Sequence, residues 1–147
     1  MNTRPPIPTV VLVYGLLGVM PFVAAPAISL AIPIAAGMAT VVQATYGALI
    51  LSFLGGARWG QEVARPAPRV MVVSLTMLPT LAALGLLMVT VRGLTMQLGL
   101  VLLLLVHWMW DMRAVDFPGW YPRLRTILTV GAVAGLVAQV LVVARAL

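Results

Sequence analysis

The chain has 147 residues, of which 63% are hydrophobic and only 8% are charged, and its mean hydropathy is +1.12. A soluble domain carries about 25% charged residues, so this composition excludes a water-soluble globular fold and predicts an integral membrane protein. The net charge of +6 comes from nine arginines at the ends of apolar runs, which favours lipid headgroups and not nucleic acid as their partner. Three acidic residues, one histidine and no cysteine leave few groups for catalysis or metal binding.

Five apolar stretches are long enough to cross a bilayer, which takes roughly 20 residues of helix. They predict an all-α, polytopic membrane protein, a compact bundle of five transmembrane helices that forms a single domain over residues 1–147. The expected helices span approximately residues 9–25, 34–57, 70–91, 94–110 and 124–143.

Prolines mark the expected ends and bends of these helices. Pro26 and Pro33 bracket a segment that we expect to be a short connection or a re-entrant corner. Pro79 lies in the middle of the third stretch and should kink that helix, because proline has no backbone N–H. The first stretch has features of a signal peptide, but the three prolines before residue 9 are unusual in one, so a retained first helix is expected.

The arginines predict the orientation of the bundle, because short loops rich in arginine stay in the cytoplasm. With five helices, one side receives Arg4, Arg58, Arg65, Arg69, Arg113, Arg123 and Arg125, and the other receives only Arg92 and Arg145. The N-terminus is therefore expected in the cytoplasm and the C-terminus in the periplasm, in a bacterial inner membrane. The acidic residues, the histidine and the four tryptophans all fall on the arginine-rich side, so any site is expected there.

Small residues predict close contacts between helices, because they let two backbones approach in a bilayer. Gly56 and Gly60 form one GxxxG pattern, Gly131 and Gly135 form another, and Ser52 near the first could form a hydrogen bond across the contact. The residues expected at packed helix faces, within the chain or against another subunit, are Ser52, Gly55, Gly56, Gly60, Gly131 and Gly135.

The expected arginine-rich ends of the second and fourth helices carry the polar residues. Arg58 and Glu62 are four residues apart and could pair on one helix face. His107 and Asp111 have the same spacing, so the carboxylate could orient the imidazole for proton handling or for contact with a quinone or a haem. The alternative is an interfacial belt, in which Trp residues contact headgroups.

The loop before the fifth helix contains aromatic residues followed by arginines. Arg123 and Arg125 could bind an acidic headgroup, a phosphate or a partner's carboxylate, or form a network of salt bridges with Asp111 and Asp116. The candidate contacts to a ligand or a partner are Trp59, His107, Trp108, Trp110, Asp111, Trp120, Tyr121 and Arg125. No residue is predicted to be catalytic, and no metal site is predicted.

Two runs of sequence, residues 46–60 and residues 118–129, resemble signatures of the small five-helix membrane family called domain of unknown function 3429. Asp111 also resembles a family position. The resemblance covers the whole chain, and the family has bacterial members and a mitochondrial transmembrane relative. It implies an energy-transducing membrane and no named activity. The family usually has His where this chain has Arg58, so a role of that His is not expected here.

The leading functional hypothesis is an accessory or assembly subunit of a larger respiratory or photosynthetic inner-membrane complex, without catalysis of its own. Its partners would be other membrane subunits or a second copy, besides the lipid bilayer. The alternative is a binding protein for a quinone, a tetrapyrrole or a lipid at the cytoplasmic face. This alternative requires the ends of the second and fourth helices to enclose a cavity. An enzyme that uses His107 and Asp111 ranks third, and no cofactor is predicted beyond contact with a quinone or a tetrapyrrole.

Overall fold

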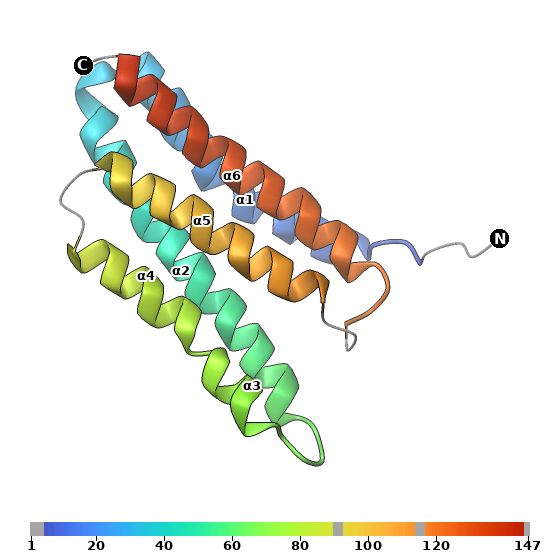
Figure 1. Cartoon of the computed structure of the whole chain (residues 1–147). Coiled ribbons are helices and arrows are strands. Elements are labelled where there is room, and N and C mark those ends of the chain that lie inside the picture. The colour runs from blue at the N-terminus through green and yellow to red at the C-terminus, as the bar shows by residue number, and fades with distance from the viewer. Residues whose placement is uncertain (1–4, 90–92, 114–116, 146–147) are drawn as a thin grey trace.

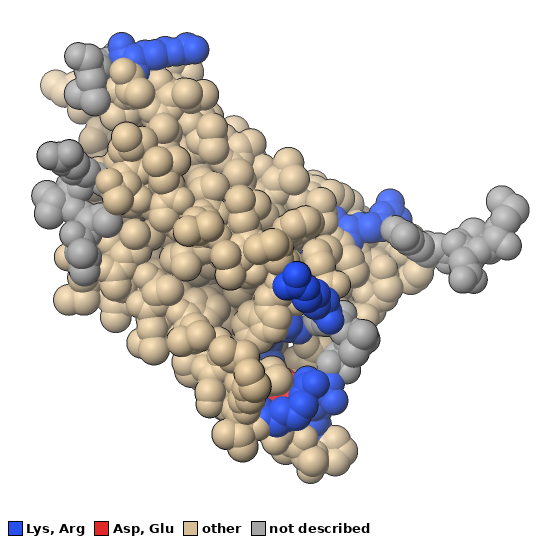
Figure 2. Space-filling model, in the orientation of Figure 1, with Lys and Arg blue, Asp and Glu red and all other residues tan. Residues whose placement is uncertain are grey.

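The computed structural model describes residues 5–89, 93–113 and 117–145, and these segments are mostly helical. The helices are α1 (Thr9–Ala31), α2 (Ala36–Val63), α3 (Val70–Leu75), α4 (Leu78–Val89), α5 (Gly93–Met112) and α6 (Tyr121–Arg145). With α3 and α4 counted as one segment, five helices are long and apolar enough to cross a membrane, which confirms the predicted fold class. Figure 2 shows the charged side chains at the ends of the molecule, with an uncharged band between them.

Helices α2 and α5 form the middle of the bundle (Figure 1). On one side of this pair lie α1 and α6, which pack against each other, and on the other side lies α4. The core between them contains fully buried side chains from four helices, namely Phe22, Leu51, Leu100, Leu104 and Leu136. Leu102 and Met88 remain 62% and 76% exposed, as is typical of a surface that faces lipid acyl chains.

Helix α1 continues to Ala31, so the expectation that it ends near Pro26 is wrong. Pro26 lacks the N–H that would bond to the Phe22 carbonyl inside a helix. The amide Nε2 of Gln43 on α2 donates to that carbonyl instead, over 2.7 Å. A partner from a neighbouring helix therefore satisfies the carbonyl that Pro26 leaves free, and α1 continues through Pro26 as it does through Pro21. The connection to α2 is Ile32 and one 3-10 turn, and the described chain from 27 to 36 forms no re-entrant corner.

The third membrane segment is broken at Thr76 and Met77, which confirms the bend predicted from Pro79. The Thr76 carbonyl lies against Gly55 of α2, where a Cβ would come within 2.6 Å of the oxygen. Thr80 on α4 donates a hydrogen bond of 3.1 Å to Ser52 on α2, as expected for a contact across packed helices. Gly55 and Ser52 together hold the broken segment against α2.

The two GxxxG patterns have different surroundings. A Cβ on Gly131 would come within 2.7 Å of Val19, and a Cβ on Gly135 would overlap the Phe22 carbonyl, so both glycines lie where α1 and α6 touch. By contrast, a Cβ on Gly56 or Gly60 would meet nothing within 4 Å. These two glycines therefore pack against no other helix in the described part of the chain, because that face of α2 turns outward, and contact with another subunit stays a prediction.

Candidate functional site

Charged side chains from three helices meet in the interior near one end of the bundle, which we call the arginine-rich end. Asp111 on α5 is 1% exposed, and Arg58 on α2 and Arg125 on α6 are 8% and 5% exposed. The Arg125 Nε atom donates to Asp111 Oδ2 over 2.6 Å. The Arg58 Nε atom lies 3.4 Å from Oδ1, where it contributes charge but makes no hydrogen bond.

Two further side chains lie against the same carboxylate. Tyr121, the first residue of α6, donates its hydroxyl to Asp111 Oδ2 over 3.3 Å. The Nδ1 atom of His107 lies 3.4 Å from Oδ2, one helical turn before Asp111, which confirms the proximity predicted from their spacing. We call Arg58, His107, Asp111, Tyr121 and Arg125 the Asp111 cluster.

Arg58 does not pair with Glu62, so the expected pair on one helix face is wrong. Glu62 points toward the loop after α2, where its carboxylate accepts hydrogen bonds of 2.9 and 2.7 Å from the Arg69 side chain. Arg58 turns inward because α5 presents Asp111 there. Its Nη2 atom also donates to the Trp110 carbonyl over 3.3 Å, and its guanidinium lies 4.4 Å from the centre of the Trp110 ring, a cation–π contact.

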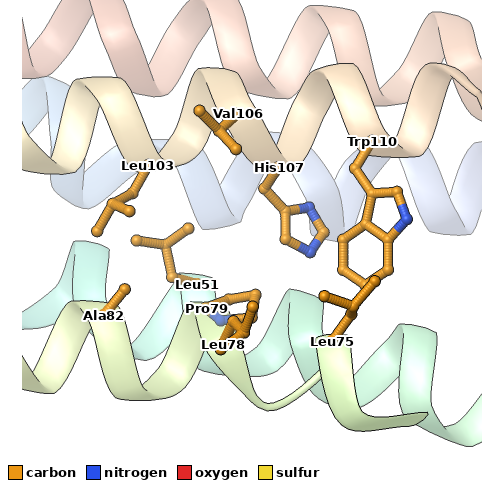
Figure 3. A pocket seen from close by; sticks show the side chains of 9 residues that line it. All are labelled: Leu51, Leu75, Leu78, Pro79, Ala82, Leu103, Val106, His107 and Trp110. Carbon is orange, nitrogen blue, oxygen red and sulfur yellow. The ribbon is translucent and has the colours of Figure 1, made fainter. Parts of the chain in front are cut away.

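A cavity of about 230 Å³ lies between α2, α5 and the α3–α4 segment (Figure 3). His107 and Trp110 line it together with apolar side chains such as Leu51, Leu78 and Pro79. Figure 3 shows the imidazole pointing from α5 toward Leu78 and Pro79. Neither imidazole nitrogen has a hydrogen-bond partner, although both are buried. We call this space the His107 cavity.

A second cavity of about 260 Å³ lies between α1, α2 and α6, on the other side of the Asp111 cluster. Arg125 and Thr129 line it, and most of its other walls are apolar, with Phe22, Leu54 and Ala132 among them. We call it the Arg125 cavity. The Asp111 cluster thus contributes one side chain to each of two separate cavities.

Three of the expected contact residues lie outside this arrangement. Trp59 is 42% exposed and lines neither cavity. Trp108 donates its indole N–H to Thr126 Oγ1 over 3.1 Å and so joins α5 to α6. Trp120 packs edge-on against Tyr121, with ring centres 6.3 Å apart. Asp116, expected in the salt-bridge network, lies outside the described residues.

Sequence reasoning missed a second buried polar group, which lies toward the other end of the bundle. Gln43 on α2, Gln97 on α5 and Gln139 on α6 are at most 1% exposed. Gln97 Nε2 donates to Gln43 Oε1 over 2.7 Å, and Gln139 Nε2 donates to Thr40 Oγ1 and Ser29 Oγ over 2.8 and 2.9 Å. The signal was available, since each glutamine interrupts an otherwise apolar stretch. Buried polar contacts between helices are therefore not confined to the arginine-rich end.

The fold and the Asp111 cluster define a five-span membrane protein with a charged interior at one end. The family described as "Protein of unknown function (DUF3429)" matches residues 7–141, and the chain belongs to this family. This confirms the resemblance found in the sequence.

The chain is also similar to a curated protein named transmembrane protein 69, from Xenopus tropicalis. The two are 34% identical over 142 residues, which cover 91% of this chain and 54% of that protein. The chain therefore spans about half the length of the curated relative. No solved structure matches. Both sequence runs that carry the family resemblance reach the Asp111 cluster, since the first contributes Arg58 and the second contributes Tyr121 and Arg125.

Proposed function

We propose that this protein binds an apolar small molecule with a ring and a hydrogen-bonding group, such as a quinone head group, in the His107 cavity, without catalysis of its own. The observation that carries the proposal is the burial and hydrogen bonding of the His107 side chain. It is a buried imidazole on the wall of an otherwise apolar cavity, and its Nε2 atom has no hydrogen-bond partner, whereas Nδ1 faces the Asp111 carboxylate at 3.4 Å. Buried polar groups are nearly always paired, and ligand pockets combine apolar walls with a few polar groups.

The size of the His107 cavity narrows the class of ligand. An apolar cavity of about 150 Å³ holds one benzene molecule. At about 230 Å³, this cavity matches a single substituted ring, whereas most of a tetrapyrrole would extend outside it. The Trp110 indole on its wall offers an aromatic surface for ring contact. A quinone ring therefore fits better than a tetrapyrrole.

The charge distribution supports an orientation for the proposed site. Of the arginines in the described residues, only Arg145 lies at the end of the bundle away from the Asp111 cluster. Arginine-rich loops are retained in the cytoplasm. We therefore place the His107 cavity near the cytoplasmic face of a bacterial inner membrane as part of this proposal.

Binding of a quinone is expected to quench tryptophan fluorescence, because Trp110 lines the cavity. The test uses the full chain purified in dodecyl maltoside and titrated with duroquinone. Replacing His107 with Phe keeps a flat ring but removes the hydrogen bond, so affinity should fall roughly fivefold. Ala82→Leu should abolish saturable quenching because it fills the cavity from α4. Ala57→Leu, at an exposed position outside the cavity, is the matched control. Equal quenching of all four proteins would contradict the proposal.

A second candidate function is that of an accessory subunit within a larger membrane complex, and the outward-facing Gly56 and Gly60 favour it. They give α2 a smooth exposed strip where another helix could approach closely. Purification from native membranes in a mild detergent should then recover a complex, and Gly56→Leu should dissociate it. Gly85→Leu is the control and should leave the complex intact, because Gly85 is equally open but lies on α4. Recovery of the unmodified chain as a lone monomer would rule this candidate out.

A further inference from the structure

We propose that the Arg125 cavity is a second binding site, which takes the carboxylate of an apolar acid such as a fatty acid. This inference is independent of the proposed quinone site, because it concerns a different cavity with walls from different helices. It rests on two unpartnered donors, on the balance of buried charge and on the shape of the cavity.

The polar groups of the cavity are two donors on one face of α6. Arg125 and Thr129 are four residues apart and are 5% and 4% exposed. The Nη2 atom of Arg125 and the Oγ1 atom of Thr129 are buried and have no hydrogen-bond partner. A helical threonine commonly donates to the carbonyl four residues before it, so its free hydroxyl is unusual. Both side chains line the Arg125 cavity, where the two oxygens of a carboxylate could accept from both donors.

The charges of the Asp111 cluster favour a single negative charge in this cavity. Among the described residues, the cluster holds two guanidinium groups, those of Arg58 and Arg125, against the one carboxylate of Asp111. Arg58 has further contacts with the Trp110 carbonyl and ring, whereas the Nη2 atom of Arg125 has none. A buried charge without a counterion is costly, and one monoanion restores neutrality. A phosphate dianion would exceed that balance, so a carboxylate is the better match.

The remaining walls suit an apolar chain that extends away from the carboxylate. The cavity reaches from Arg125 to Ala132 along α6, a rise of roughly 10 Å at 1.5 Å per residue, so it takes the carboxyl half of a long acyl chain and the rest extends beyond the cavity toward lipid. Phe22 and Val19 of α1 lie on the facing wall. Gly18 also lines it, and a Cβ there would meet only the Tyr46 hydroxyl, at 3.7 Å. A larger side chain at this position would therefore enter the cavity without striking the backbone.

The test measures binding of radiolabelled dodecanoate to the full chain in dodecyl maltoside by scintillation proximity, in buffer that ionises the acid. Unlabelled dodecanoate, dodecyl phosphate and dodecanol serve as competitors. Thr129→Val keeps the shape of the side chain but removes the hydroxyl, and should weaken binding roughly tenfold, as expected for a hydrogen bond to a charged group. Gly18→Val should abolish binding because it occupies the cavity. Thr45→Val, at an exposed threonine bonded only to its own helix, is the matched control.

The proposal predicts that dodecanoate competes best, dodecyl phosphate less well and dodecanol least. Equal competition by all three, or binding that Gly18→Val leaves unchanged, would mean adsorption to the lipid-facing surface and would overturn it. Absence of saturable dodecanoate binding would also overturn it. Stronger competition by dodecyl phosphate than by dodecanoate would contradict the carboxylate and identify a phosphate headgroup as the ligand. Duroquinone titration of Thr129→Val separates the two sites, because this variant should retain quenching even where dodecanoate binding is lost.

Discussion

Replacement of Asp111 with Asn is expected to be the most damaging single substitution in the Asp111 cluster. It leaves the guanidinium groups of Arg58 and Arg125 buried together, with no carboxylate between them. Removing one partner of a buried ion pair typically costs about 3–5 kcal/mol, because the remaining charge is not hydrated. The free energy of unfolding, measured by titrating the detergent-solubilised protein with sodium dodecyl sulfate, should fall by an amount in this range.

Two variants control this experiment. Glu62→Gln makes the same chemical change, but the side chains of its partners Arg65 and Arg69 are 32% and 55% exposed. The free energy of unfolding should therefore fall clearly less than in Asp111→Asn. Adding Arg125→Gln to Asp111→Asn removes one of the two stranded charges and should recover part of the stability. The explanation fails if Asp111→Asn is no more harmful than Glu62→Gln, or if the double variant is the least stable of all.

Gln43→Leu is expected to have the second largest effect on stability. Gln43 belongs to the buried polar group toward the other end of the bundle. The Gln43 amide donates to the carbonyls of Phe22 and Gly135, over 2.7 and 3.1 Å, and accepts from Gln97 over 2.7 Å. Hydrogen bonds between membrane helices contribute about 0.6 kcal/mol on average and up to about 1.7 kcal/mol each. The loss of all three should lower the free energy of unfolding by roughly 2–4 kcal/mol in the same titration.

A double-mutant cycle with Pro26 tests the cause of that effect. Pro26→Ala restores a backbone N–H four residues after Phe22, so the carbonyl regains a partner inside α1. Gln43→Leu should therefore cost less when Pro26 has been replaced than when it is present. Thr45→Val, two residues from Gln43 but exposed, should be close to neutral. An identical cost in both backgrounds would show that Gln43 does not substitute for the missing N–H.

The membrane spans follow from local properties of the chain, and the sequence predicts them well. Five apolar stretches become five membrane segments, and Pro79 bends the third as its missing N–H requires. Pro26 has the same local chemistry, yet α1 passes through it. The carbonyl that Pro26 leaves free accepts from Gln43, which is far from Pro26 in sequence and reaches Phe22 only because α2 packs beside α1. Local rules therefore predict which carbonyl loses its helical partner, but the packed neighbours decide whether another donor replaces it.

The contrast between local spacing and helix packing also explains which contacts of the site could be predicted from the sequence. His107 and Asp111 are one helical turn apart, so their proximity needs only the helix. The partner of Arg58 depends on how α2 is rotated, and that rotation turns Arg58 toward Asp111 while Trp59, Gly56 and Gly60 face outward. Rotation about the helix axis is fixed by contacts among all the helices. A spacing of four residues on α2 therefore could not distinguish Glu62 from Asp111 as the partner.

The pairing of α1 with α6 has a consequence for how the protein is made. Synthesis delivers the helices to the membrane in sequence order, so α6 arrives after the helices that it completes. Until then, Asp111 lacks Arg125 and Tyr121, and Gln43 lacks the Gly135 carbonyl. Ionisable and polar side chains exposed to acyl chains are costly. The nascent chain therefore carries unsatisfied polar side chains near both ends of the bundle until the last helix has inserted.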